Sequence, residues 1–188
     1  MSLTPSNMIP LGSIAPGFEL PDVVAGIKVN LDDIKSNKAT VIMFICNHCP
    51  YVKHVKTELV RLANDYMPRD VTFVAISSND IEKYPEDAPD KMREDAVTWQ
   101  YPFPYLFDET QRVARIYDAA CTPDFYLYDK NMELVYRGQL DDSRPGNEKP
   151  LTGNDLRNAL DSVLDGNPVS TNQIPSVGCN IKWKELAM

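Results

Sequence analysis

Residues 41–50 read Val-Ile-Met-Phe-Ile-Cys-Asn-His-Cys-Pro, an apolar run followed at once by two cysteines and a proline. An unbroken apolar run of this length is typical of a central strand covered on both faces, as parallel strands usually are. After Pro50, apolar residues recur at steps of three and four as far as Tyr66, and charged residues fill the opposite face. The stretch therefore predicts a buried strand, a cysteine pair at its end and an amphipathic helix.

The rest of the chain repeats this alternation. Further strands are predicted at residues 71–76, 104–107, 125–128 and 134–138, further helices at residues 88–99, 109–117 and 154–164, and an N-terminal hairpin at residues 18–20 and 27–30. Asp108 is expected to cap the helix at 109–117. The order of these elements predicts an α/β fold, a mixed central sheet with helices on both faces. We expect one domain over residues 1–168 and a C-terminal tail, residues 169–188, packed on it.

Composition narrows the classes of function. The chain has 188 residues, enough for one domain with a sizeable core, and a formal net charge of -8. The negative charge and the lack of a basic block argue against nucleic acid or an anionic membrane as a partner. The sequence shows neither a secretory signal nor an apolar run near the roughly 20 residues that span a bilayer. We therefore expect a cytoplasmic protein.

The pair Cys46 and Cys49 carries the predicted chemistry. A cysteine at the start of a helix lies near unpaired amide groups, which stabilise an anion. In such settings the pKa of a thiol falls from about 8.5 to roughly 3.5–7.5. We therefore expect Cys46 to attack a disulfide and Cys49 to resolve the mixed disulfide, with protonated His48 stabilising the thiolate. This cycle requires no bound cofactor and no metal.

Two other interpretations of the pair remain open. Buried cysteines are often inert, because cysteine is among the most buried residue types. Alternatively, Cys46, His48, Cys49 and His54 offer four metal donors within a short segment. His54, however, is expected on the solvated face of the helix, which leaves the set one ligand short. The metal interpretation would make the chain a metal-binding or non-catalytic module.

A second motif gives the chain a family resemblance. Together with the Cys46–Cys49 pair, Thr122 and Pro123 before the strand at 125–128 resemble the thioredoxin superfamily. Residues 15–20 (Ala-Pro-Gly-Phe-Glu-Leu), 103–108 (Phe-Pro-Tyr-Leu-Phe-Asp) and 125–129 (Phe-Tyr-Leu-Tyr-Asp) are similar to the redoxin branch, which includes AhpC/TSA peroxiredoxins and TlpA-like thiol-disulfide proteins. The similarity covers about residues 14–164.

The resemblance implies a thioredoxin-like fold and the activity of a thiol-disulfide oxidoreductase. It implies that Pro123 is cis, and that the backbone of Thr122 offers hydrogen bonds to a substrate strand beside Cys46. The implied substrate is a protein or small-molecule disulfide. A dithiol reductant such as a thioredoxin system would recycle the enzyme.

The sequence departs from its relatives at several positions. Peroxiredoxins carry a threonine or serine where this chain has Met43 and a proline where it has Ala39, which argues against efficient peroxide reduction at the usual peroxiredoxin site. An antioxidant, thiol-dependent peroxidase is the alternative function. Thioredoxins carry a buried aspartate where this chain has Thr40, which leaves the general base unassigned. Asp124 is a candidate if it turns toward Cys49, and a solvated carboxylate is the other interpretation.

Two more cysteines lie outside the pair. Cys121 stands two positions before Pro123, and Cys179 lies in the C-terminal tail. They either form a second redox pair, or one of them relays electrons to Cys46 and Cys49, or both are inert. Sequence alone does not give the geometry that decides between these possibilities.

Overall fold

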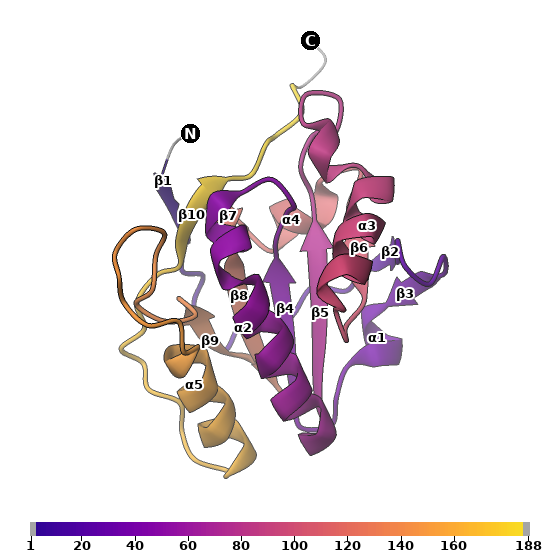
Figure 1. The fold of residues 1–188 in the computed structure, drawn as a ribbon. Helices are drawn as coiled ribbons and strands as arrows, with labels where there is room; N and C mark the ends of the chain where they lie inside the picture. Colours follow the sequence, from indigo (N-terminus) through magenta and orange to yellow (C-terminus); the bar gives the residue numbers. More distant parts are fainter. Residues whose placement is uncertain (1–2, 186–188) are drawn as a thin grey trace.

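A five-stranded mixed sheet forms the centre of the computed structural model, which describes residues 3–185 (Figure 1). Its strand order is β6-β5-β4-β8-β9. The strands are β4 (Ala39–Phe44), β5 (Val71–Ser77), β6 (Tyr105–Phe107), β8 (Asp124–Asp129) and β9 (Leu134–Gly138). β4 lies in the middle, parallel to β5 and antiparallel to β8. The predicted α/β architecture is confirmed.

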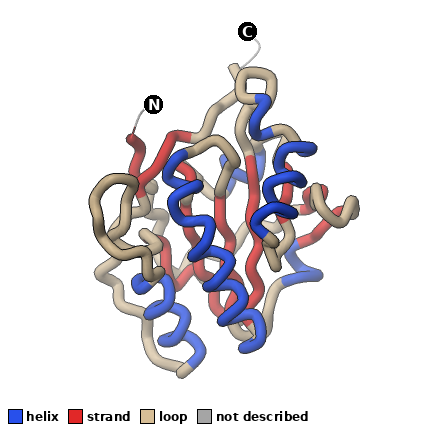
Figure 2. Tube along the Cα trace, in the orientation of Figure 1, coloured by secondary structure: helices blue, strands red, loops and turns tan. Residues whose placement is uncertain are grey.

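Helices cover both faces of this sheet (Figure 2). The helices are α1 (Leu31–Ile34), α2 (Pro50–Tyr66), α3 (Pro89–Trp99), α4 (Arg112–Ile116) and α5 (Asn154–Leu164). Successive side chains of a strand point to opposite faces. In β4, Val41 and Met43 pack with α2, α3 and α5, and Ile42 and Phe44 pack with α4 and the N-terminal segment. This alternation explains why residues 41–44 of β4 are all apolar.

The N-terminal hairpin predicted from the sequence is present. β2 (Glu19–Pro21) pairs antiparallel with β3 (Lys28–Asn30). α4 is shorter than expected, because Gln111 adopts a left-handed conformation with φ of 61° and the helix begins only after it. The Asp108 carboxylate still accepts a hydrogen bond from the Ala114 amide in the first turn of α4, and it also accepts one from the Ser78 hydroxyl.

A small second sheet joins the two ends of the chain. Its order is β1-β10-β7, with β1 (Leu3–Pro5), β10 (Val177–Asn180) and β7 (Cys121–Thr122). β10 runs antiparallel to both neighbours. The C-terminal tail therefore lies along the segment that leads into Pro123 (Figure 1). Between residues 3 and 185, the helices all fall short of the length and apolarity needed to cross a membrane.

Candidate active site

The cysteine pair lies where the central strand gives way to the long helix. Cys46 follows the end of β4, and Cys49 is the residue that caps the N-terminus of α2. The Thr122–Pro123 peptide bond is cis, as the resemblance implied. Thr122 contacts both sulfurs: its Oγ1 lies 3.4 Å from Cys46 Sγ, and its carbonyl oxygen accepts a hydrogen bond from Cys49 Sγ at 3.3 Å. The pair and the proline loop are thus neighbours.

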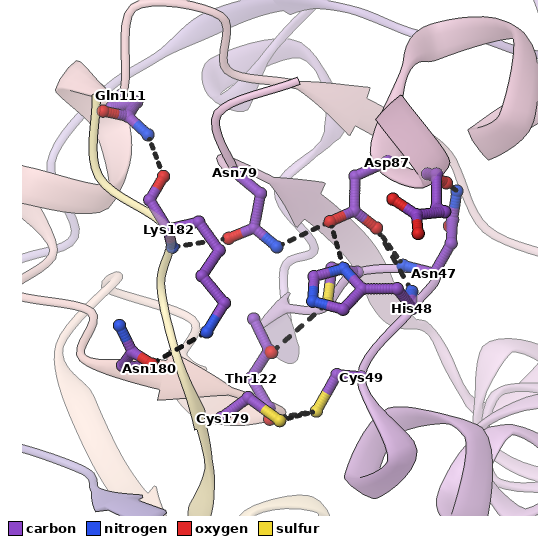
Figure 3. Close-up of polar contacts among 12 residues, drawn as sticks. Asn47, His48, Cys49, Asn79, Asp87, Gln111, Thr122, Cys179, Asn180 and Lys182 are labelled. Carbon is purple, nitrogen blue, oxygen red and sulfur yellow. Dashed lines mark hydrogen bonds and ion pairs between the residues drawn. The ribbon is translucent and has the colours of Figure 1, made fainter. Parts of the chain in front are cut away.

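A third cysteine reaches the same place. Cys179 Sγ, from β10, lies 2.8 Å from Cys49 Sγ (Figure 3). Cys121 does not join them, since its thiol contacts the carbonyl oxygen of Pro123 at 3.6 Å. The four cysteines all lie within the described residues, all are buried, and the structure holds them as thiols without a disulfide. The predicted Cys121–Cys179 pairing is therefore not the arrangement seen.

The two sulfurs of the pair lie in different electrostatic surroundings. Contact with the Cys46 thiol lowers the pKa of Cys49 to about 5, and Cys179 and the Val52 amide add to the effect. Burial raises the pKa of Cys46, and the Cys49 sulfur and the Asp87 carboxylate raise it further. The favoured thiolate is therefore Cys49, not Cys46 as the sequence suggested. The hydrogen bond with Cys46 is the main cause, and the helix contributes to it because α2 begins at Pro50, so the Val52 amide lies next to the second cysteine.

Asp87 organises the turn that carries the pair. Its Oδ1 accepts the backbone amides of Asn47 at 2.8 Å and His48 at 3.2 Å. Its Oδ2 lies 2.6 Å from His48 Nδ1 and accepts a hydrogen bond from Asn79 at 2.7 Å (Figure 3). The Asp87 side chain is completely buried. Sequence reasoning missed this residue, because nothing local distinguishes it from the neighbouring Glu86.

His48 and Asp87 form an ion pair rather than a free cation beside the thiols. The hydrogen bond to Asp87 raises the pKa of His48. Burial works to raise the pKa of Asp87, but the hydrogen bonds from His48 and Asn79 outweigh it and hold that pKa below its usual value. The imidazole also stacks on Tyr84, with ring centroids 5.2 Å apart. Asp87 thus pairs with the positive charge that the sequence analysis expected to stabilise the thiolate.

Asp124 does not serve as the general base. Its buried carboxylate accepts a hydrogen bond from the Ser6 hydroxyl at 2.6 Å and forms an ion pair with Arg137 at 3.1 Å. These partners fix it away from the sulfurs. Burial raises its pKa, and Arg137 opposes that shift. The sequence expected either a base or a solvated carboxylate, and the structure shows a buried structural ion pair.

The four metal donors considered from the sequence are not brought together. His54 is half-buried, not solvated as expected, and its Nε2 lies 2.7 Å from the Ser143 hydroxyl. Within residues 3–185, the group that comes nearest to a metal site is Cys46, His48 and Asp87, whose donor atoms lie within 4.8 Å of one another. The Asp87 carboxylate is already engaged by His48, Asn47 and Asn79. The geometry therefore fits a hydrogen-bonded thiol site better than a metal centre.

A mixed sheet, a Cys-x-x-Cys pair at the start of a helix and a facing cis-proline define a thioredoxin-like protein. Residues 11–137 match the model of the AhpC/TSA family. The chain therefore belongs to the AhpC/TSA family of thioredoxin-like redoxins, a family of redox enzymes, and the sequence-based assignment is confirmed.

Solved structures extend this result. An uncharacterized conserved protein from Geobacillus kaustophilus is 62% identical, with a TM-score of 0.98 over 100% of this chain and 99% of that one. A hypothetical protein from Sinorhizobium meliloti is 47% identical, with a TM-score of 0.95 over 97% of this chain and 100% of that one. A thiol:disulfide interchange protein from Chlorobium tepidum shares the fold at 17% identity, with a TM-score of 0.63 over 84% of this chain and 99% of that one. No curated protein is significantly similar to the chain in sequence.

Proposed function

We propose that this protein is a thiol-disulfide oxidoreductase that reduces disulfides of proteins or small molecules through Cys46 and Cys49. One observation carries the proposal: Cys46 and Cys49 meet at the N-terminus of α2, opposite the cis-proline loop, and share a single favoured thiolate. A pair with one thiolate and one thiol at neutral pH holds the two species that disulfide exchange requires.

The first half of the cycle uses Cys49 as the base. Its thiolate takes the proton of the neighbouring Cys46 thiol, so the base that the sequence left unassigned is the second cysteine. The Cys46 thiolate attacks one sulfur of the substrate disulfide. A mixed disulfide forms, and the other substrate sulfur leaves as a thiolate.

The second half returns the charge to Cys49. The departing thiolate accepts the proton held by Cys49, and the Cys49 thiolate attacks Cys46 in the mixed disulfide. The second substrate thiolate leaves and takes a proton from water, and the enzyme holds a Cys46–Cys49 disulfide. Two electrons have passed from the enzyme to the substrate. A dithiol partner, such as a thioredoxin system, restores the two thiols in a separate exchange.

The test is the reduction of a model protein disulfide with excess dithiol as electron source. Cys46→Ser abolishes turnover. Cys49→Ser removes both the base and the resolving thiol, so the attack by Cys46 slows and the molecules that do react stop at the mixed disulfide on Cys46. Cys121→Ser is the matched control, because Cys121 lies outside the pair, and it retains activity. Turnover that survives Cys46→Ser or Cys49→Ser would refute the two-thiol cycle.

Hydroperoxide consumption, measured in parallel, distinguishes the proposed function from the alternative, a thiol-dependent peroxidase. The position where peroxiredoxins carry a hydroxyl residue is Met43 here, which is completely buried in the core beneath α2. Without that hydroxyl we expect peroxide turnover to be slow compared with disulfide reduction. Faster turnover with peroxide would favour the antioxidant function.

A further inference from the structure

β10 brings a cysteine of the C-terminal tail onto the cis-proline loop. In the β10–β7 ladder, Cys179 is paired with Thr122, and Asn180 with Cys121. Residues directly opposite one another in a ladder share a face, and the next residues point the other way. Cys179 and Thr122 therefore both face the cysteine pair, whereas Cys121 faces away from it.

The approach of β10 to this loop depends on a glycine. A Cβ added to Gly178 would lie 2.0 Å from the Thr122 carbonyl oxygen, far inside contact distance. Any other residue at this position would push β10 away from Thr122. The glycine thus allows the two backbones to meet and brings Cys179 Sγ to 2.8 Å from Cys49 Sγ. A disulfide bond is about 2.05 Å long, so a small movement converts this contact into a bond.

Hydrogen bonds on both sides of Cys179 hold the tail at the site. The Ser176 hydroxyl donates to the Pro123 carbonyl oxygen at 2.6 Å. Beyond the strand, the Lys182 amide donates to Asn79 Oδ1 at 2.9 Å, and the amide nitrogen of the same Asn79 donates to Asp87 (Figure 3). The tail and the turn that carries the pair therefore share one hydrogen-bond network.

β10 pairs with β7 at the edge where, according to the family resemblance, a substrate strand would bind. The backbone of Thr122 was expected to receive such a strand, and here it pairs with the chain's own tail. The tail also brings the Cys179 sulfur to 2.8 Å from Cys49, the resolving cysteine. β10 thus lies where a substrate strand would pair with Thr122, and it carries a thiol in reach of Cys49.

We propose that Cys179 is a third redox-active cysteine, which attacks Cys49 in the Cys46–Cys49 disulfide and forms a Cys49–Cys179 disulfide. This inference rests on the proposed function, which supplies the first disulfide. The Cys179 thiol loses its proton, the Cys49–Cys179 bond forms, the Cys46–Cys49 bond breaks, and Cys46 leaves as a thiolate that takes up a proton. No electrons enter or leave. The product latches β10 on the proline loop and returns Cys46 to the thiol state.

Disulfide mapping in the full chain tests this exchange. The wild type and variants are equilibrated with a mixture of oxidised and reduced glutathione, quenched with acid, alkylated and analysed by peptide mass spectrometry. In Cys46→Ser, which isolates the second pair, we expect a Cys49–Cys179 disulfide in most molecules, with Cys121 alkylated. Recovery of Cys179 as an alkylated thiol, with Cys49 free or joined to glutathione, would overturn the proposal.

A second variant leaves all four cysteines in place. Gly178→Ala moves β10 away from Thr122, so the Cys49–Cys179 disulfide falls at least tenfold relative to wild type and the Cys46–Cys49 disulfide still forms. Gly17→Ala is the matched control, because a Cβ at Gly17 meets no atom within 4 Å. A Cys49–Cys179 yield in Gly178→Ala equal to that of the control would contradict the inference.

The variant Cys179→Ser separates the two proposals. If Cys179→Ser forms the Cys46–Cys49 disulfide but Cys46→Ser forms no Cys49–Cys179 disulfide, the inference fails and the proposed function stands. If Cys179→Ser forms no Cys46–Cys49 disulfide, the proposed function itself fails.

Discussion

At the scale of single residues, the site divides charge between two adjacent sulfurs. Burial disfavours a negative charge on Cys46, and the neighbouring Cys49 and Asp87 add to this effect. The hydrogen bond with Cys46 favours a negative charge on Cys49, and Cys179 and the Val52 amide of α2 add to it. The site is therefore organised as a thiol beside a thiolate, rather than as two equivalent cysteines.

A titration of the reduced protein tests whether Cys49 is the thiolate and Cys46 the thiol. We expect one thiolate to appear with a midpoint near pH 5, the pKa of Cys49, as followed by the ultraviolet absorbance of the thiolate. Cys49→Ser removes this transition, and Cys121→Ser leaves it in place. The first transition appearing only near the ordinary thiol pKa of about 8.5 would contradict the assignment.

Removing the Asp87 carboxylate tests its effect on the pKa of Cys46. Asp87→Asn takes away the hydrogen bond that raises the pKa of His48 and the charge that raises the pKa of Cys46. We expect both pKa values to fall, and alkylation of Cys46 at neutral pH, measured in the Cys49→Ser background, to accelerate several-fold. Glu86→Gln, an exposed neighbour, is the control and leaves the rate unchanged.

The same ion pair sets a pH window for stability. The raised pKa of His48 means that its contribution is complete below its unfolded value of about 6.5 and is lost as the pH rises through the folded value. The lowered pKa of Asp87 means that its contribution is lost as the pH falls through that lowered value. Both contributions are complete between the unfolded pKa of Asp87, about 3.9, and that of His48, about 6.5, so wild type exceeds Asp87→Asn in unfolding free energy most in this range. A difference that does not change with pH would exclude this role.

What the sequence predicted at this scale follows from chain proximity. Cys46 and Cys49 are close because two residues separate them, and the cis bond before Pro123 was implied by the family resemblance. Asp87 and Cys179 reach the pair through the paths of long connections, which no local pattern encodes. The sequence therefore missed Asp87 and named Cys179 only as one of several possibilities, whereas it predicted the pair itself.

At the scale of elements, a buried ion pair joins the antiparallel strands β8 and β9 to the N-terminal segment. Arg137 is completely buried, bonded to Asp124 and to the Ser6 hydroxyl, and lies over the Tyr126 ring at 4.3 Å. Removing one partner of such a pair leaves an uncompensated buried charge. These contacts tie the edge of the main sheet to the segment that follows β1.

Arg137→Met should lower the free energy of unfolding by about 3–5 kcal/mol, measured by urea denaturation, because Asp124 loses its counter-charge. The double variant Arg137→Met/Asp124→Asn recovers part of the loss, since no charge remains buried. Arg69→Met is the control, because its pair with Asp161 is largely exposed and contributes about 0–1 kcal/mol. Equal losses in Arg137→Met and Arg69→Met would show that burial does not decide the cost.

The long elements and the short strands β2, β3 and β6 were predictable, whereas β7 and β10 were not. α5 begins and ends at Asn154 and Leu164 as its periodicity indicates, and β4 and β5 differ from expectation by one or two residues. β7 has two residues and β10 contains Gly178 and Asn180, so neither carries an alternating pattern. The sheet that closes over the site exists because separate parts of the chain meet, and a pattern within one segment cannot show that.

At the scale of the whole molecule, the redox state of three sulfurs determines how far the chain is cross-linked. A Cys46–Cys49 disulfide closes a loop of a few residues, whereas Cys49 and Cys179 are 130 positions apart. Cross-links stabilise chiefly by restricting the unfolded chain, and the effect grows with the logarithm of loop length. Exchange from the first disulfide to the second therefore changes global stability, even though no electrons are transferred.

The expected difference is large enough to measure. On the chain-entropy model, the long loop stabilises the protein by about 5 kcal/mol and the short loop by about 2 kcal/mol. Oxidation should therefore raise the unfolding free energy of Cys46→Ser by about 3 kcal/mol more than it raises that of Cys179→Ser, measured by urea denaturation. Comparing each variant with its own reduced state cancels the cost of the substitution. Equal gains on oxidation would mean that Cys49 and Cys179 do not form the long-range cross-link, and that β10 covers the site without being bound to it.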